Sequence, residues 1–203
     1  MTRIANAEAR PYRSELRAEQ ADATRARILE ATLRVMGRGM ATMSIPEVAR
    51  EAGVSVPTVY RHFGSKEDLL AAVYPYVARR VGLDKLPDPA TIDDLRDGLR
   101  AIFRKVDAFG DLERAAMASP GANETRRLTM PQRLQRLSRL ADSVQPQLAK
   151  ADRDRITRLL AVLTASSSLR MWRDHLGVSV EQAADDIDWV MRASIAASQR
   201  SRP

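Results

Sequence analysis

The stretch from residue 42 to residue 68, TMSIPEVAREAGVSVPTVYRHFGSKED, constrains the fold more than any other part of the chain. Ser44 and Glu47 have the spacing of a capping box, in which a hydroxyl and a carboxylate satisfy the free amides at a helix start. Pro46 fits the first turn of the same helix because the amides there have no partner to lose. Gly53 suits the end of the helix. These signals predict a short helix between Ser44 and Gly53.

A second short helix is expected from Val56 to about His62, with Ser55 as its cap. Val59 and Phe63 recur at a helical spacing and are expected to face inward. A helix this short is not stable alone, so its neighbours must hold it. The two helices and the tight turn between them are typical of a helix-turn-helix.

The other face of this second helix carries side chains that suit contact with nucleic acid. Thr58, Tyr60, Arg61 and His62 offer a hydroxyl, a phenol, a guanidinium and an imidazole, which are suited to a major groove. Lys66 lies at the start of the next helix, where a phosphate can meet the positive end of that helix. A lone aromatic or a lone histidine is usually an ordinary helix residue, but here they flank an arginine. The combination favours contact with phosphates or bases.

Two runs, RARILEATLRVMGRGMATMSIPEVA and AGVSVPTVYRHFGSKEDLLAAV, resemble the DNA-binding domain of the TetR family of transcriptional repressors. The resemblance extends from about Thr24 to Val77. It implies an all-α chain, with an N-terminal three-helix helix-turn-helix DNA-binding domain and a helical C-terminal domain for ligand binding and dimerisation. It also implies a homodimer that binds a palindromic double-stranded DNA operator and is released by a small-molecule effector.

The residue pattern and the resemblance together indicate a set of DNA contacts. The expected DNA-binding residues are Thr42, Ser44, Ser55, Val56, Pro57, Thr58, Tyr60, Arg61, His62 and Lys66. The resemblance implies that Tyr60 and Lys66 meet the DNA backbone, as do the two hydroxyls at the start of the first short helix. The hydroxyls and the guanidinium of the second helix are expected near bases or phosphates. Its valine and proline offer apolar contact, for example to thymine methyl groups.

Composition agrees with a DNA-binding protein and argues against an enzyme. The formal net charge of +7 favours a polyanionic partner. The chain has no cysteine, and its two histidines, His62 and His175, have no acid or nucleophile at a catalytic spacing. Asp185, Asp186 and Asp188 diverge around a helix, which favours a solvated face. We therefore expect no catalytic site, no metal site and no cofactor.

The hydropathy pattern predicts a cytoplasmic protein without a membrane partner. No run approaches the roughly 18 apolar residues of a membrane span, and the N-terminus lacks the apolar core of a signal peptide. Residues 1–22 are expected to be a mobile basic arm, either a solvated tail or a segment that reaches DNA. Residues 23–80 are expected to form the DNA-binding domain with the start of a connecting fourth helix. Residues 81–203 are expected to form the ligand-binding and dimerisation domain.

Helical periodicity continues through the C-terminal part, where no strand alternation occurs. A loop is expected at residues 119–125, because serine, proline, glycine and asparagine cluster there. A helix from 131 to 150 follows, which Pro146 either bends or ends. A long helix is expected from 152 to 175 and a last helix from 179 or 181 to about 198.

Two sets of apolar side chains in these helices are given roles by hypothesis. A largely apolar pocket of drug-like size, for an apolar or mixed effector, is expected to be lined by Phe103, Phe109, Met117, Leu137, Leu163, Met171 and Trp172. The dimer interface is expected to contain Leu159, Leu163, Ser167, Ile187, Val190, Met191, Ser194 and Ile195. The two tryptophans, Trp172 and Trp189, either fill the core or line the pocket or the dimer seam.

Two other functions stay open at this point. One is an architectural DNA binder without an effector, which a diffuse rather than a sharp palindromic footprint would distinguish. The other is a helical ligand carrier or enzyme that retains the fold, which would need a polar constellation in the C-terminal half.

Overall fold

The structure is a computed structural model that describes residues 9–38 and 43–200 of the chain. Within these residues the chain forms ten α-helices and one π-helical segment and no strand, which confirms the expected all-α class. The elements are α1 (Ala9–Gly37), α2 (Ile45–Ala52), α3 (Val56–Phe63), α4 (Lys66–Arg80), α5 (Ile92–Asp107), α6 (Asp111–Ala118), α7 (Pro120–Val144), α8 (Lys150–Leu163), α9 (Ser166–Arg170), η1 (Met171–His175) and α10 (Val180–Arg200).

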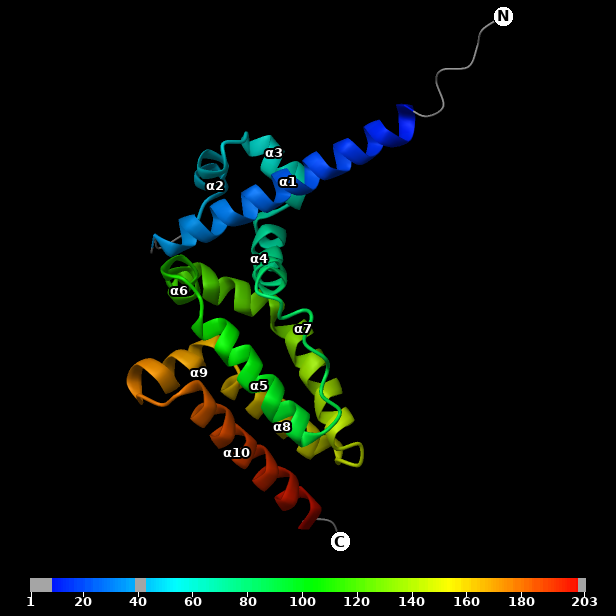
Figure 1. Cartoon of the computed structure of the whole chain (residues 1–203), viewed down its shortest axis with the longest axis vertical. Helices are drawn as coiled ribbons and strands as arrows, with labels where there is room; N and C mark the ends of the chain where they lie inside the picture. The colour runs from blue at the N-terminus through cyan, green and yellow to red at the C-terminus, as the bar shows by residue number, and fades with distance from the viewer. Residues whose placement is uncertain (1–8, 39–42, 201–203) are drawn as a thin grey trace, which may run out of the picture.

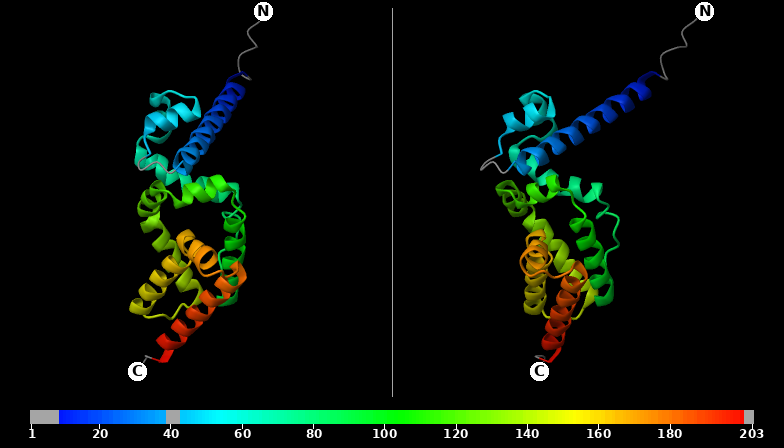
Figure 2. Two further views of the ribbon diagram at one scale, coloured as in Figure 1. Left: turned by 90° about the vertical axis from the view of Figure 1, so that its left-hand side faces the viewer. Right: turned by 60° about the vertical axis from the view of Figure 1, so that its left-hand side comes forward.

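Helices α1, α2 and α3 lie together at one end of the molecule, and α4 leads from them to the remaining helices (Figure 1). The last helix, α10, runs to the opposite end, so the start of α1 and the end of α10 lie far apart in every view (Figure 2). No helix in the described ranges combines the length and the apolar character that a bilayer span requires. This arrangement places the α2–α3 pair at an outer surface.

The first hydrophobic core lies between α1 and the helix-turn-helix. Its fully buried side chains are Ile28, Leu29, Val35, Val48, Val59, Leu69 and Leu70. Ala116 of α6 and Ala122 of α7 belong to the same cluster. The backbones also approach closely, since a Cβ added to Gly37 would lie 3.1 Å from the side chain of Leu112. The core of the DNA-binding half therefore includes residues from beyond the expected boundary at residue 80.

The first helix begins earlier than the sequence pattern predicted. Residues 9–22 of the expected mobile basic arm (residues 1–22) are helical, because α1 begins at Ala9. The Thr24 hydroxyl donates to the carbonyl of Gln20 at 2.8 Å inside the helix, so it does not cap a helix start. Residues 1–8 lie outside the described residues.

The loop expected at residues 119–125 is also wrong, because α7 begins at Pro120. The Ser119 hydroxyl accepts from the amide of Ala122 at 3.2 Å and donates to the carbonyl of Ala116 at 2.6 Å. A serine cap with a proline in the first turn marks a helix start here, as it does at the start of α2. At its other end α7 stops at Val144, so Pro146 follows the helix instead of bending it.

The long helix expected from 152 to 175 is divided into three segments. α8 ends at Leu163, α9 begins at Ser166, and the chain continues as the π-helical η1. Thr164 lies at the break, where its hydroxyl donates to the carbonyl of Leu160 at 2.7 Å. The break brings the end of α8 and the start of α9 to face α7. This position matters for the charged cluster described below.

The second core joins α5, α7, α8 and α10 around Phe103 and Leu160. Ile187 and Met191 of α10 belong to this core and are 0% and 1% exposed. Two of the eight residues expected at the dimer interface therefore have no surface to offer to a second copy. The inward stripe of α10 packs on α5 within the protomer.

Candidate nucleic-acid interface

The capping box predicted at the start of α2 is confirmed. The amide of Glu47 donates to the Ser44 hydroxyl at 3.4 Å, and the Ser44 amide donates to the Glu47 carboxylate at 3.1 Å. The Ser44 hydroxyl also donates to that carboxylate at 2.7 Å. The hydrogen bonds from Ser44, first from its side chain and then from its backbone, lower the pKa of Glu47. Thr42, an expected phosphate contact, lies outside the described residues.

The turn between α2 and α3 depends on Gly53, as predicted. Gly53 has φ +63°, a left-handed conformation that residues with a Cβ rarely adopt. The next amide, that of Val54, donates to the carbonyl of Ala49 at 3.0 Å, which closes the end of α2. The turn fixes the direction in which α3 leaves α2.

The recognition helix α3 is stabilised by contacts with the first core and with α1, as its short length requires. Val59 and Phe63 are buried against the first core, which confirms the expected inward face. Arg25 of α1 donates from Nη1 to the carbonyl of His62 at 2.6 Å, and its guanidinium lies 4.2 Å from the centre of the Phe63 ring. A cation over an aromatic face at this distance is attractive. The sequence pattern gave no signal for Arg25, because its partners lie far along the chain.

The outer face of α3 presents the side chains that the sequence predicted. Tyr60 is 46% exposed, and Arg61, Pro57 and Ser55 are exposed as well. Thr58 is partly buried, and its hydroxyl lies 2.8 Å from that of Ser55. This face therefore carries a phenol, a guanidinium and a pair of hydroxyls close together.

Two of the expected contacts are less available than the sequence suggested. Val56 is partly buried and packs against the first core. His62 is also partly buried, and burial, followed by the charges of Arg61 and Arg25, lowers its pKa. Near neutral pH its imidazole therefore stays neutral, and it offers a hydrogen bond rather than a charge.

Lys66 is engaged by the C-terminal part of the protein. Its Nζ lies 3.5 Å from Oε2 of Glu124 on α7, and both side chains are partly buried. The expected contact between Lys66 and a DNA phosphate therefore competes with this ion pair. Sequence reasoning missed Glu124 because it lies in the segment that was read as a loop.

The basic side chains around α2 fall into two groups. Arg34 and Arg38 both bind Glu51, with Nε of Arg34 at 2.7 Å from Oε1, and these hydrogen bonds lower the pKa of the Glu51 carboxyl. Arg50 and Arg61 are exposed and have no carboxylate at ion-pair distance in the described part of the chain. The second group places two guanidinium groups without an ion-pair partner beside the recognition helix, where their positive charge attracts phosphates.

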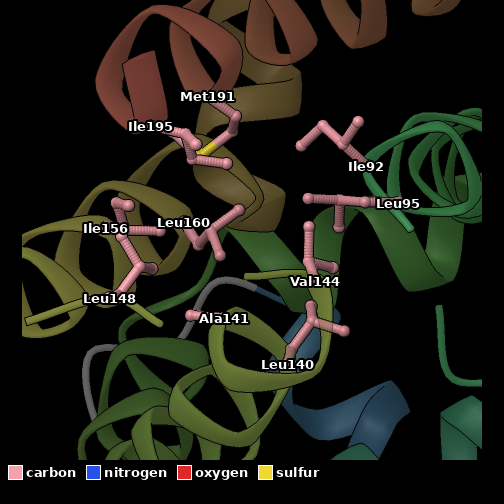
Figure 3. A pocket seen from close by; sticks show the side chains of 10 residues that line it. All are labelled: Ile92, Leu95, Leu140, Ala141, Val144, Leu148, Ile156, Leu160, Met191 and Ile195. Carbon is pink, nitrogen blue, oxygen red and sulfur yellow. The ribbon is translucent and has the colours of Figure 1, made fainter. Parts of the chain in front are cut away.

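The residues expected to line a ligand pocket are spread over different environments. Phe103 and Phe109 are buried, Met171 is 52% exposed, and the other four are partly buried. An apolar cavity of about 10 Å³ lies instead between α5, α7, α8 and α10, lined by residues such as Leu95, Leu140 and Leu160 (Figure 3). None of the seven expected residues lines it. This cavity is far smaller than the roughly 300–1,000 Å³ of typical ligand pockets.

Large apolar side chains are exposed on the C-terminal helices. Trp189 of α10 is 72% exposed and Val162 of α8 is 65% exposed. Leu176, just after η1, is exposed as well. Of the other expected interface residues, Ser167 is exposed, and Leu159, Leu163, Val190, Ser194 and Ile195 are partly buried. Sequence reasoning left Trp189 open and did not identify Val162.

The arrangement of α1 to α4 defines a class of protein. A capped α2, a glycine turn and a supported α3 with an exposed polar and basic face form a helix-turn-helix DNA-binding domain. Residues 28–73 match the sequence model of a family described as bacterial regulatory proteins, tetR family. This segment is therefore similar to the DNA-binding domain of the TetR family of transcriptional regulators, as the resemblance in the sequence indicated.

Curated relatives are similar over about a third of the chain. The chain is 38% identical over 72 residues to the HTH-type transcriptional regulator SrpR of Pseudomonas putida, over 35% of this chain and 34% of that protein. It is also 38% identical over 72 residues to TtgW of Pseudomonas putida, an uncharacterised HTH-type transcriptional regulator, over 35% of this chain and 54% of that protein. With BetI of Brucella anthropi, another HTH-type transcriptional regulator, it shares 33% identity over 61 residues, which are 30% of this chain and 31% of BetI. The chain thus spans about a third to a half of these relatives.

A solved structure extends the similarity in fold to most of the chain. The crystal structure of a TetR-like transcriptional regulator from Rhodococcus sp. RHA1 superposes with a TM-score of 0.53 and covers 84% of this chain and 94% of that one. The sequences are 20% identical, so the likeness concerns the fold. The helices that follow α4 therefore have a counterpart in another TetR-like protein.

Proposed function

We propose that this protein is a transcriptional repressor that binds a palindromic operator as a homodimer and releases it when a small-molecule effector binds. The observation that carries the proposal is the geometry of α3, an eight-residue helix held by Arg25 and by its own buried face. Its exposed face holds Tyr60 and Arg61 beside the Ser55–Thr58 hydroxyl pair. A supported helix of this length fits a major groove.

The proposal assigns different tasks to these side chains. The exposed Tyr60 phenol of α3 is assigned to a phosphate, because its single hydroxyl can donate to a phosphate oxygen but cannot make the paired contacts that identify a base edge. The exposed Arg61 guanidinium is assigned to a base, since a bidentate contact to guanine is the commonest specific arginine contact. Phosphate contacts set position and affinity, whereas base contacts set sequence preference.

A homodimer follows from the small reading surface of one helix. One α3 reads only a few base pairs, and a twofold axis doubles the site and makes it palindromic. The exposed apolar side chains of Trp189 and Val162, on α10 and α8, support an interface at this end of the molecule. Such a contact would bury about 1,600 Å² or more in total.

Control by an effector is supported by the way α4 joins the two halves. α4 begins directly after α3, and its tyrosine Tyr76 donates to Glu30 of α1 at 2.8 Å. The other half holds the same region through the Lys66–Glu124 pair and through Lys105, which donates to the carbonyl of Val81 at 2.8 Å. A ligand that shifts α7 or α5 would move α4 and thereby separate the two recognition helices. By linkage, effector and operator then weaken each other's binding equally.

Footprinting on the DNA that flanks the coding region tests the proposal, because such regulators often control themselves or a neighbouring gene. The expected result is a sharp footprint with two half-sites about one helical turn apart. A diffuse, sequence-independent footprint would favour an architectural DNA binder without an effector. The small size of the cavity is compatible with this second candidate.

Operator panels with single variants then test the assigned roles. Tyr60→Ala is expected to weaken binding to all operator sequences by a similar factor. Arg61→Ala is expected to relax preference at one base pair, at a cost of roughly 1–3 kcal/mol for the preferred base. A uniform loss for Arg61→Ala would remove this residue from base reading.

A further inference from the structure

Two arginines of α7 point toward the break between α8 and α9. Arg126 and Arg133 are seven positions apart, about two helical turns, and therefore lie on one face of α7. Arg126 donates from Nη2 to the Met117 carbonyl at 2.7 Å and to the Ser166 hydroxyl at 3.2 Å. Arg133 donates from Nη2 to the Thr164 hydroxyl at 2.7 Å. Both side chains thus reach the same junction of the fold.

None of these acceptors carries a negative charge. The remaining hydrogen bond of Arg126 goes from Nη1 to the side-chain amide oxygen of Asn123 at 2.7 Å. Arg170 of α9 adds a third guanidinium, and its buried Nε has no hydrogen-bond partner. Across residues 9–38 and 43–200, no carboxylate lies at ion-pair distance from any of the three. Other arginines of this half differ: Arg173 binds Asp107 at 2.7 Å.

Burial makes this arrangement costly. Burial lowers the pKa of Arg126 and of Arg133, and for Arg126 the charges of Arg170 and Arg133 lower it further. Arg126 is therefore close enough to Arg170 and to Arg133 to be repelled by both. Arg170 also contributes to the lowered pKa of Asp174, but that carboxylate is hydrogen-bonded first of all by Arg173. Desolvated cations without a counter-charge are unfavourable in a folded protein.

The helix ends nearby compensate only in part. The Met117 carbonyl belongs to the last turn of α6, and Thr164 follows the last residue of α8. A helix C-terminus carries the equivalent of about half a negative charge, and its effect falls off within the last turn. Two such ends do not balance three guanidinium groups. A small anion would do so, and planar guanidinium forks match carboxylates and phosphates in geometry.

We propose that Arg126, Arg133 and Arg170 form the binding site for the anionic group, a carboxylate or a phosphate, of a small-molecule effector. This inference rests on the proposed function, because it names the ligand class of the repressor. It revises the expectation of an apolar or mixed ligand.

The position of the cluster explains how an anion would be felt at the DNA. Arg133 lies near Tyr74 of α4, the helix on which α7 packs. Arg126 follows Glu124, the partner of Lys66, by two positions on α7. Binding of an anion between α7 and α9 would pull on α7 and so act on the start and the middle of α4. α4 is the helix that continues from the recognition helix.

Thermal unfolding of the full chain tests the inference, with Arg133→Met and Arg126→Met as variants and Arg127→Met as the matched control. Arg127 is an exposed arginine on the same helix. The probes are sodium octanoate, octyl phosphate, inorganic phosphate and neutral octanol, each at the ionic strength of a sodium chloride reference. Footprints on the operator are recorded with the same probes.

The expected result has two parts. Without a probe, Arg133→Met and Arg126→Met melt at the same temperature as the wild type or higher, because each removes an uncompensated cation. At about ten times its dissociation constant, an anionic probe raises the wild-type melting temperature by about 3–5 °C. This shift persists in Arg127→Met and is lost in the other two variants. Comparing the melting-temperature shifts with octanoate and with octyl phosphate identifies the preferred anion. The shift with inorganic phosphate shows whether the charged group alone is sufficient for binding.

Several results would overturn the inference. A fall of several degrees in the melting temperature of Arg133→Met without a probe would make its guanidinium a structural brace between α7 and α8. The anion site would be refuted if octanol and the anions raised the melting temperature equally, or if no anion raised it. It would also be refuted if the shift in melting temperature persisted in both Arg126→Met and Arg133→Met. A wild-type chain that gives no operator footprint refutes the proposed function instead. If anions stabilise the chain but none alters its operator footprint, the site binds anions without regulating DNA binding. That result would refute the assignment of the site to an effector.

Discussion

Replacing Trp189 with alanine is the most direct test of the proposed dimer. Trp189 is 72% exposed in the protomer, whereas a covered tryptophan buries about 150–250 Å². Covering the exposed part would remove about 110–180 Å² from water, worth about 3–4 kcal/mol at about 25 cal/mol per Å². Costs of association leave about 2 kcal/mol per copy as a realistic loss on truncation. Two copies per dimer then give about 4 kcal/mol, or a roughly thousand-fold weaker dimer.

Sedimentation velocity over a range of protein concentrations measures this change. We expect Trp189→Ala to shift from dimer to monomer while its circular dichroism keeps the helical content of the wild type. Operator binding should weaken in parallel, because a monomer holds one half-site. Tyr60→Ala is the matched control, since it also removes an exposed aromatic side chain but from α3. It should lose DNA affinity and keep the wild-type dimerisation constant.

The neighbouring Ile187 gives the opposite expectation and completes the test. Ile187 is 0% exposed and lies in the second core, so Ile187→Ala should lower the free energy of unfolding by about 2–5 kcal/mol. If Trp189→Ala dimerises as tightly as the wild type, the interface does not include the exposed side of α10. The reasoning would also fail if Ile187→Ala were as stable as the wild type.

Two further predictions concern charged pairs. Glu124→Gln frees Lys66 from its ion pair and should tighten operator binding by up to about five-fold, since an ion pair near the surface is worth about 0–1 kcal/mol. Fluorescence anisotropy at two salt concentrations measures the affinity, and an unchanged affinity would exclude Lys66 from DNA contact. Hydrogen bonds from Arg34 and Arg38 lower the pKa of the Glu51 carboxyl. The ionised carboxylate therefore stabilises the fold at pH values above the usual glutamate pKa of about 4.3. This stabilisation is lost as the pH falls through the lowered pKa. Denaturant unfolding of the wild type and Glu51→Gln from pH 7 to pH 3 should therefore show a stability difference that shrinks toward low pH, whereas a constant difference would contradict the assignment.

The helix-turn-helix could be predicted from local sequence. The capping box at Ser44, the glycine turn at Gly53 and the cap at Ser55 were all predicted and all occur. Each of these depends on hydrogen bonds and backbone conformation within a few residues, so the local sequence is sufficient. The inward positions Val59 and Phe63 followed from helical spacing for the same reason.

Which side chains of these elements are buried, exposed or paired depends on the packing between helices that are distant in sequence. Arg25 holds the end of α3 from 37 positions away, and nothing in the local sequence of either residue indicates this contact. Periodicity gave an apolar stripe on α10, but only the position of α5 determines that Ile187 is buried while Trp189 is exposed. The cluster around Arg126 and Arg133 is of the same kind, because it forms only where α8 breaks at Thr164 and turns toward α7. Side-chain burial and charge pairing depend on which helices meet, and this is fixed by the packing of the whole chain rather than by any one segment.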